Sequence, residues 1–259
     1  MSLLRPAPAP RLRPPLALRR RLAAAPAAAA LALVLGACSG IDGITGPRRS
    51  VAAAPVRPPI LFVHGWNANA TTWNTMVARF KADGYTDREL VAWSYNTAQS
   101  NATTAQQIRT KVDSMLAATG ATRVDLISHS MGALSARYYV KNLGGAAKVD
   151  AFVTLAGTNH GTQTAYACLQ LSCLQMWPNS QFLGALNATD ETPGAPRYAT
   201  WWSPCDEVVY PQKSALLSGA TNTQTACLRH SQLHEDAAVY AQVRAWVQPA
   251  PVLAVAAGL

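Results

Sequence analysis

The sequence predicts an α/β fold with a mostly parallel central sheet flanked by helices on both faces. From about residue 59 onward, short apolar runs alternate with segments of helical periodicity, and strands separated by helices form a parallel sheet covered on both sides. Hydrophobic residues make up 49% and charged residues 14% of the chain, so the sequence can bury a sizeable core. The sequence shows no internal repeat, which disfavours a repeat architecture.

The first half of the domain contains three expected strands, each followed by an expected helix. The strands are short apolar runs, and the helices place apolar residues three or four positions apart on one face. A glycine follows each helix as a C-terminal cap, at positions 84, 120 and 144. The expected strands are 59–63, 89–93 and 123–127, and the expected helices are 71–81, 103–118 and 131–143.

The second half continues with expected strands at 151–155, 198–202 and 223–228 and ends in a helix at 233–247. The longest interruption of this pattern is the stretch 158–197. Long connections in compact domains commonly carry function, so we expect this stretch to provide contacts to a bound substrate.

The net charge of +9 is concentrated at the N-terminus, where residues 1–37 hold six Arg and no acid. Without this segment, 16 basic and 13 acidic residues leave +3, so no basic stripe supports a nucleic-acid partner. The arginines precede an apolar run at 22–37, which has the form of a secretory signal and is short for a membrane span. We expect a signal peptide at 1–37, an anchor and linker at 38–58, the α/β domain at 59–248 and a tail at 249–259.

The segment Leu35 to Cys38 resembles the lipobox at which bacterial lipoproteins are lipidated and cleaved. An acylated Cys38 would anchor the chain stably, because two or more acyl chains hold a protein on a membrane. Ser39 follows rather than Asp, so we expect an outer-membrane or cell-surface lipoprotein rather than one retained in the inner membrane. The alternative is ordinary cleavage after Ala54, which would give a periplasmic or secreted protein.

The strongest motif is Ser128-His129-Ser130-Met131-Gly132, which follows an apolar strand and opens a helix. This is the context of a nucleophile elbow, a tight turn that requires small residues two before and two after the nucleophile. Gly132 meets this requirement, and Ser128 replaces the first Gly of G-x-S-x-G by another small residue. We therefore predict that Ser130 is a nucleophile, the alternative being a Ser that only caps the helix.

A serine nucleophile needs a base and a group that orients this base. His129 adjoins the nucleophile and should point away from its hydroxyl, while His64 and His160 end strands and are expected to shape the site by hydrogen bonding. The chain order nucleophile, acid, base leaves His230 and His234. We favour His230 on the loop before the final helix, and expect His234 to be a surface or supporting group.

The acid is expected on the loop after the strand 198–202, where Asp206 lies. Glu207 is its close rival and is expected to be a solvated carboxylate, whereas Asp190 and Glu191 precede that strand. The position of Asp206 in the chain therefore makes it the predicted acid.

Backbone amides are the expected donors to the oxyanion of a tetrahedral intermediate. One is the N–H of Met131 at the start of a helix, and the other is the N–H of Trp66 after the first strand. The histidines lack the paired spacing of a motif such as H-E-x-x-H, so we expect neither a metal site nor a cofactor.

From about residue 59 to 247, the chain resembles small secreted bacterial lipases and esterases of the α/β-hydrolase superfamily, of the class 2 lipase type. The resemblance implies an α/β-hydrolase fold, and it prefers His230 over His234 as the base. The segment 166–176 has no equivalent in this group. The segments that carry the resemblance are 63–66 (oxyanion loop), 128–132 (nucleophile motif), 154–162 (a strand end), 179–187 (a helix before the acid), 203–209 (acid loop) and 230–240 (base and final helix).

We therefore predict a monomeric serine lipase or carboxylesterase that cleaves lipid-like or small esters through an acyl-enzyme. A polyester depolymerase or an acyltransferase would use the same triad, and the alternative from another class is a non-catalytic envelope lipoprotein that uses the fold for binding. At least half of the candidates for an apolar acyl groove are expected to be ordinary core. These candidates are Trp177, Phe182, Leu183, Trp201 and Trp202.

Apart from Cys38, the chain has four cysteines, and an even number in an exported chain favours disulfides. Cys168 and Cys173 are five positions apart and can close a local loop. Cys205 immediately precedes the predicted acid, and Cys227 lies three residues before the predicted base. Because the acid and base loops must lie side by side, we predict the pairs Cys168–Cys173 and Cys205–Cys227.

Overall fold

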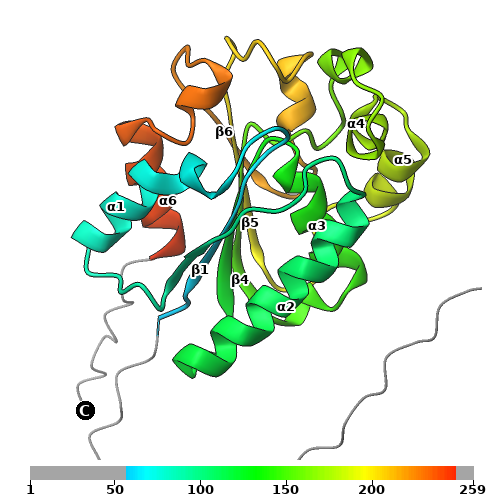
Figure 1. The fold of residues 1–259 in the computed structure, drawn as a ribbon. Coiled ribbons are helices and arrows are strands. Elements are labelled where there is room, and N and C mark those ends of the chain that lie inside the picture. The colour runs from blue at the N-terminus through cyan, green and yellow to red at the C-terminus, as the bar shows by residue number, and fades with distance from the viewer. Residues whose placement is uncertain (1–56, 249–259) are drawn as a thin grey trace, which may run out of the picture. The chain divides into compact units, whose positions relative to one another are not determined.

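The computed structural model describes residues 57–248, and the strands in this part of the chain form one parallel sheet (Figure 1). The strand order is β2-β1-β3-β4-β5-β6, and each neighbouring pair is parallel. The strands are β1 (Ile60–Val63), β2 (Leu90–Ala92), β3 (Val124–His129), β4 (Val149–Leu155), β5 (Arg197–Trp202) and β6 (Thr221–Gln224). The parallel sheet predicted from the sequence is confirmed.

Helices cover both faces of this sheet, with α1 and α6 on one face and α2 and α3 on the other (Figure 1). The helices are α1 (Asn74–Ala82), α2 (Asn101–Thr119), α3 (Gly132–Asn142), α4 (Leu171–Met176), α5 (Gln181–Asn187) and α6 (Ala237–Val247). None of the helices between residues 57 and 248 is long and apolar enough to cross a membrane.

The core is divided by the sheet, because successive side chains of a strand point to opposite faces. Ile60 and Phe62 of β1 belong to the apolar cluster beneath α1 and α6. Leu61 and Val63 belong to the cluster beneath α2 and α3. All four are fully buried, which is why the first strand is a continuous apolar run in the sequence.

The last strand and the last helix differ from the predicted ranges. β6 ends at Gln224 rather than at 228, because Ser203 holds the following segment in a loop. The Ser203 hydroxyl accepts a hydrogen bond from the Leu228 amide at 2.9 Å and donates one to the Leu228 carbonyl at 2.6 Å. α6 begins at Ala237 rather than at 233, because the Asp236 carboxylate caps it by accepting hydrogen bonds from two amides of its first turn.

The long interruption after β4 is not structureless, since it contains α4 and α5. These helices pack beside the start of α3 (Figure 1). Met131 and Leu134 of that region share a third apolar cluster with Met176 and Leu183. The segment is thereby placed against the residues that follow the predicted nucleophile.

Candidate active site

The turn between β3 and α3 holds Ser130 in a strained backbone conformation. Its φ is 55°, in the left-handed region that residues other than glycine rarely adopt. The turn also lies against the end of β1. A Cβ at Gly132 would come within 2.4 Å of the His64 carbonyl oxygen, and one at Gly65 within 2.8 Å of the Ser130 Cβ. Such strain at a serine that is 7% exposed and lines a cavity is typical of a nucleophile elbow.

Ser128 occupies the position at which the elbow motif has its first glycine. Its side chain is fully buried, and its hydroxyl donates a hydrogen bond to the Val153 carbonyl on β4 at 3.1 Å. A small side chain with a satisfied hydroxyl therefore fits where the motif has no side chain at all.

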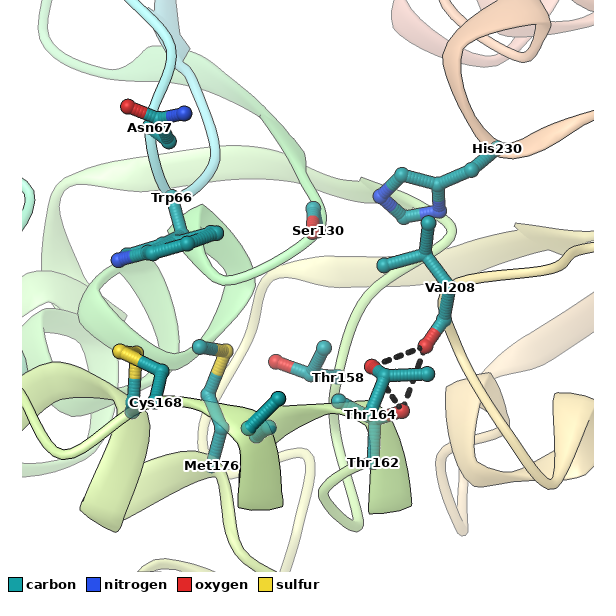
Figure 2. A pocket seen from close by; sticks show the side chains of 13 residues that line it. Trp66, Asn67, Ser130, Thr158, Thr162, Thr164, Cys168, Met176, Val208 and His230 are labelled. Atoms are coloured by element: carbon teal, nitrogen blue, oxygen red, sulfur yellow. Dashed lines mark hydrogen bonds between the residues drawn. A yellow bond between two sulfur atoms is a disulfide. The ribbon is translucent and has the colours of Figure 1, made fainter.

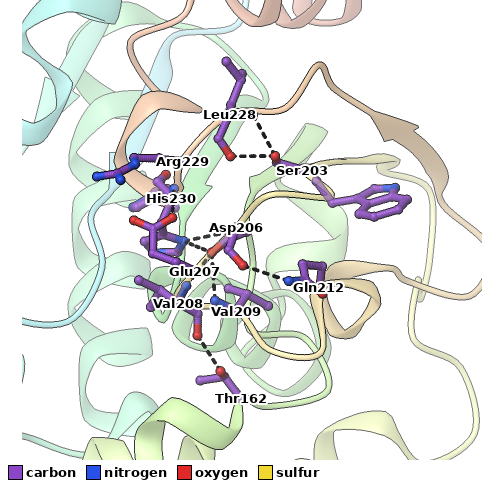
Figure 3. A network of polar contacts seen from close by, with 12 residues as sticks. Thr162, Ser203, Asp206, Glu207, Val208, Val209, Gln212, Leu228, Arg229 and His230 are labelled. Carbon is purple, nitrogen blue, oxygen red and sulfur yellow. Dashed lines mark hydrogen bonds and ion pairs between the residues drawn. The ribbon is translucent and has the colours of Figure 1, made fainter.

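The predicted acid and base contact each other (Figure 3), and the His230 carbonyl is bound by His129, the residue before Ser130. The His230 Nδ1–H donates to Asp206 Oδ2 at 2.9 Å, and Asp206 is 2% exposed. The same carboxylate accepts hydrogen bonds from the amides of Val208 and Val209, both at 2.8 Å. These contacts fix the imidazole with Nδ1 protonated, which leaves Nε2 free to accept a proton.

Glu207, the rival acid, has a different partner. Its carboxylate accepts a hydrogen bond from the backbone amide of His230 at 3.1 Å. The structure thus brings both acidic residues to His230, but only Asp206 contacts the imidazole.

Ser130 and His230 line one cavity, and the free edge of the His230 ring is turned toward Ser130 (Figure 2). Within the described residues, no hydrogen bond joins the two side chains. Catalytic hydrogen bonds are often long in a free enzyme and shorten when substrate binds. The arrangement can therefore support a proton transfer from a serine hydroxyl to a histidine.

Both amides predicted to bind an oxyanion lie next to this pair of side chains. The Met131 and Trp66 N–H groups donate to no acceptor in the part of the chain that the structure describes. The Trp66 side chain is also fixed in place, because its indole N–H donates a hydrogen bond to Gln170 Oε1 at 2.7 Å. Unpaired amides at the start of a helix are suited to bind developing negative charge.

The cavity has a volume of about 380 Å³. The predicted groove residues Trp177, Phe182, Leu183, Trp201 and Trp202 are absent from its walls, and Leu183 and Trp201 are core residues. The walls come instead from the segment 158–176 and the acid loop. The sequence indicates substrate contacts in this interruption but does not indicate the individual residues. The residues it missed are Asn67, Thr158, Thr162, Thr164, Ala165, Ala167, Met176 and Val208.

The comparisons with known proteins agree with this geometry. The family described as Lipase (class 2) matches residues 57–244. The chain belongs to this family. The resemblance stated from the sequence is thereby confirmed, and the protein is a lipolytic hydrolase of carboxylic esters.

Solved structures of lipases show the same fold as this lipase. The mature form of Bacillus licheniformis lipase BlEst2 is 19% identical, with a TM-score of 0.64 over 78% of this chain and 94% of that one. Aspergillus fumigatus lipase B is 20% identical, with a TM-score of 0.64 over 74% of this chain and 53% of that one. At these identities the likeness establishes the α/β-hydrolase fold alone.

Three histidines of this lipase gather behind the elbow. His129 donates from Nε2 to the His230 carbonyl at 3.1 Å, so it points away from the Ser130 hydroxyl as predicted. The His129 ring lies 4.5 Å from that of His230 and 4.8 Å from that of His234. Of the two expectations for His234, a surface group or a supporting group, the first is wrong, since this residue is 6% exposed and packs on Trp73 and His129.

The other two histidines stand apart from the reacting groups. His64 is buried and stacks on the Tyr95 ring at 4.0 Å, and its Nδ1 donates to the Gly65 carbonyl. His160 contacts Glu191 at 2.8 Å and does not line the cavity. Burial lowers the pKa of His64, so this ring is neutral at neutral pH.

Both predicted disulfides are present in the structure. Cys205–Cys227 joins the acid loop to the segment before the base. Cys168–Cys173 closes a loop whose two sulfur-bearing residues line the cavity. Cys38 and its lipobox lie outside the described residues.

Proposed function

We propose that this lipase is an exported serine ester hydrolase whose triad is Ser130, His230 and Asp206. The observation that carries the proposal is the strained Ser130 facing a histidine whose opposite nitrogen is bound to a buried carboxylate. This arrangement of nucleophile, base and acid supports serine ester hydrolysis.

In the proposed reaction, Ser130 Oγ attacks the ester carbonyl while His230 Nε2 takes its proton. The Met131 and Trp66 amides donate to the resulting oxyanion. The tetrahedral intermediate collapses to an acyl-enzyme, and His230 returns the proton to the departing alkoxide. A water molecule, deprotonated by the same nitrogen, then attacks the acyl-enzyme and releases the acid and free Ser130. Asp206 stabilises the imidazolium in both halves.

The surface around the cavity supports a lipid-like substrate. The large hydrophobic side chains that the described part of the chain exposes lie beside cavity-lining residues in sequence, and Trp66 itself lines the cavity. Exposed apolar residues close to a cavity favour contact with an apolar partner rather than with water. These residues are Trp66, Tyr166, Leu169, Leu171 and Tyr210.

The two disulfides support export, because disulfides persist in oxidising compartments and are rare in the cytosol. Anchoring through Cys38 would place the enzyme at the outer membrane or cell surface, and release would make it periplasmic or secreted.

The test is Ser130→Ala combined with active-site labelling. A fluorophosphonate should label the wild type and not the variant, and hydrolysis of nitrophenyl esters should fall by several orders of magnitude while circular dichroism is unchanged. A chain-length series of these esters then defines the acyl preference. Near-native turnover in the variant would show that another residue is the nucleophile.

A further inference from the structure

The loop after β1 contains a buried histidine that binds one peptide group of the proposed reaction. His64 is fully buried, and its Nδ1–H donates to the Gly65 carbonyl at 2.9 Å. The Gly65 carbonyl and the Trp66 N–H belong to the same peptide group. His64 therefore holds one end of the group whose other end is proposed to donate to the oxyanion.

This peptide group lies next to the nucleophile. A Cβ at Gly65 would come within 2.8 Å of the Ser130 Cβ and 3.3 Å of the Ser130 Oγ, so a side chain here would clash with the elbow. The Trp66 N–H follows this α-carbon directly along the chain. Within residues 57–248 it donates to no acceptor, so its direction is not set by a hydrogen bond of its own.

The glycine that the elbow requires also leaves this peptide group free to rotate. A residue without a Cβ adopts many backbone conformations at little cost. Because a trans peptide is planar, its C=O and N–H point in opposite directions, and rotating the group by half a turn exchanges them. The rotated group would direct the Gly65 carbonyl, an acceptor, toward the oxyanion, whereas the proposed reaction needs the Trp66 N–H there.

His64 is fixed so that it favours the productive orientation. Its ring stacks on the Tyr95 ring at 4.0 Å, and the Tyr95 hydroxyl donates to the His64 carbonyl. Because the Gly65 carbonyl can only accept, the proton of the neutral ring is on Nδ1. Rotation of the peptide would leave this buried N–H without an acceptor, which is costly. The hydrogen bond to the carbonyl also polarises the peptide, and so strengthens its N–H as a donor.

We propose that His64 is a positioning residue that fixes the peptide between Gly65 and Trp66 with its N–H toward the oxyanion. The inference rests on the proposed function and adds a residue that acts through Trp66 without touching the substrate. The oxyanion forms only when Ser130 attacks, so the contribution of His64 belongs to the transition state. Its loss should lower kcat and leave KM close to the wild-type value.

The test compares His64→Leu, which removes the donor, with His64→Asn, whose amide nitrogen takes the place of the imidazole Nδ1. On a soluble nitrophenyl butanoate, kcat should fall by about tenfold to a hundredfold in His64→Leu, with KM nearly unchanged. His64→Asn should recover most of kcat. The inhibition constant of a trifluoromethyl ketone, whose adduct with Ser130 carries an oxyanion, should rise in His64→Leu by the same factor as kcat falls.

Two results would overturn the proposal. One is an unchanged kcat in a folded His64→Leu, with circular dichroism as the check of folding. The other is an equal loss of kcat in His64→Leu and His64→Asn, since the hydrogen bond to the Gly65 carbonyl would then not be the cause.

A measurement on the wild type decides the matter if His64→Leu does not fold. Nitrogen-15 NMR of protein labelled at histidine shows which ring nitrogen carries the proton, and the spectrum of His64→Asn identifies the signals of His64. We expect the proton on Nδ1. A proton on Nε2 alone would contradict the proposal, because that tautomer cannot donate to the Gly65 carbonyl.

The proposed function and this inference fail differently. If the triad assignment is wrong, Ser130→Ala still hydrolyses the ester. If only the inference is wrong, Ser130→Ala is inactive, while His64→Leu keeps the wild-type kcat and the wild-type affinity for the ketone.

Discussion

His230 is held at three of its atoms by three side chains. Asp206 accepts from the imidazole Nδ1, Glu207 accepts from the backbone amide, and His129 donates to the backbone carbonyl. Because a displacement of the base by about 1 Å can cost about a hundredfold in rate, these contacts position the ring as well as set its tautomer. The two neighbouring carboxylates therefore have different roles: Asp206 binds the imidazole, and Glu207 binds only the backbone amide of His230.

Asp206→Asn should lower kcat by several orders of magnitude, because an amide at this position favours the wrong imidazole tautomer. Glu207→Gln is the matched control, since a Gln oxygen can still accept from the His230 amide. It should keep most of the activity. Steady-state kinetics on a nitrophenyl ester measures both variants, and the opposite pattern would transfer the acid role to Glu207.

The buried histidine His129 makes stability depend on pH. Burial, followed by the charges of His230 and His234, lowers its pKa well below the usual value. The unfolded chain then binds a proton below about pH 6.5 that the folded chain does not. Stability is therefore fully present above this pH and falls as the pH is lowered, by at most about 1.4 kcal/mol per pH unit for this group.

The free energy of unfolding, measured with urea at pH 7.5 and 5.5, should fall toward the lower pH in the wild type. It should fall less in His129→Gln. Asp125, whose pKa is raised well above its usual value by burial, contributes with the opposite sign. Its contribution is the same in both proteins and cancels in the comparison. Equal slopes would show that His129 takes up its proton in the folded state.

At the scale of elements, the acid loop and the base loop are joined by more than the triad. Ser203, at the end of β5, holds both backbone groups of Leu228, and Cys205 is bonded to Cys227. The same contacts end β6 at Gln224, before the predicted end at residue 228. The geometry of the triad thus depends on a short covalent and hydrogen-bonded connection between two loops.

Removing this bridge with Cys205→Ala/Cys227→Ala should destabilise the fold by about 3 kcal/mol, because the bond closes a loop of 22 residues. Activity should fall at temperatures where circular dichroism still shows an intact fold. The control is Cys168→Ala/Cys173→Ala, which removes a five-residue loop in the cavity wall and should change acyl preference more than unfolding temperature. Peptide mapping without reduction checks the pairing, and a bond between Cys205 and Cys168 would contradict it.

The sequence predicted the central strands and the turn between β3 and α3 because their signals are local. Apolar runs specify buried parallel strands, and small residues around Ser130 specify the elbow. The start of α6 was missed because the Asp236 cap competes with a helical pattern that begins earlier. The cavity walls were missed because a residue such as Thr158 lines the site through the folding of a connection that has no periodic signal.

At the scale of the whole molecule, the charge and the apolar surface are segregated along the chain. Most of the net charge of +9 belongs to residues 1–37, and the large hydrophobic residues that the described part of the chain exposes lie within two positions of cavity-lining residues in the sequence. A lipid anchor at Cys38 would keep such a site close to membrane lipids, joined to it by a linker rich in Gly, Pro and Ala.

The proposed anchor at Cys38 depends on residues outside those that the structure describes. Cells that express the wild type should incorporate labelled palmitate into the protein and retain it in the outer-membrane fraction. Cys38→Ser should lose the label and leave the membrane with unchanged specific activity, because Cys38 lies outside the catalytic domain predicted at 59–248. Ser39→Asp is the matched control, and it should keep the label and shift to the inner membrane. An unlabelled wild-type protein whose mature N-terminus is Pro55 would show ordinary signal cleavage after Ala54 instead.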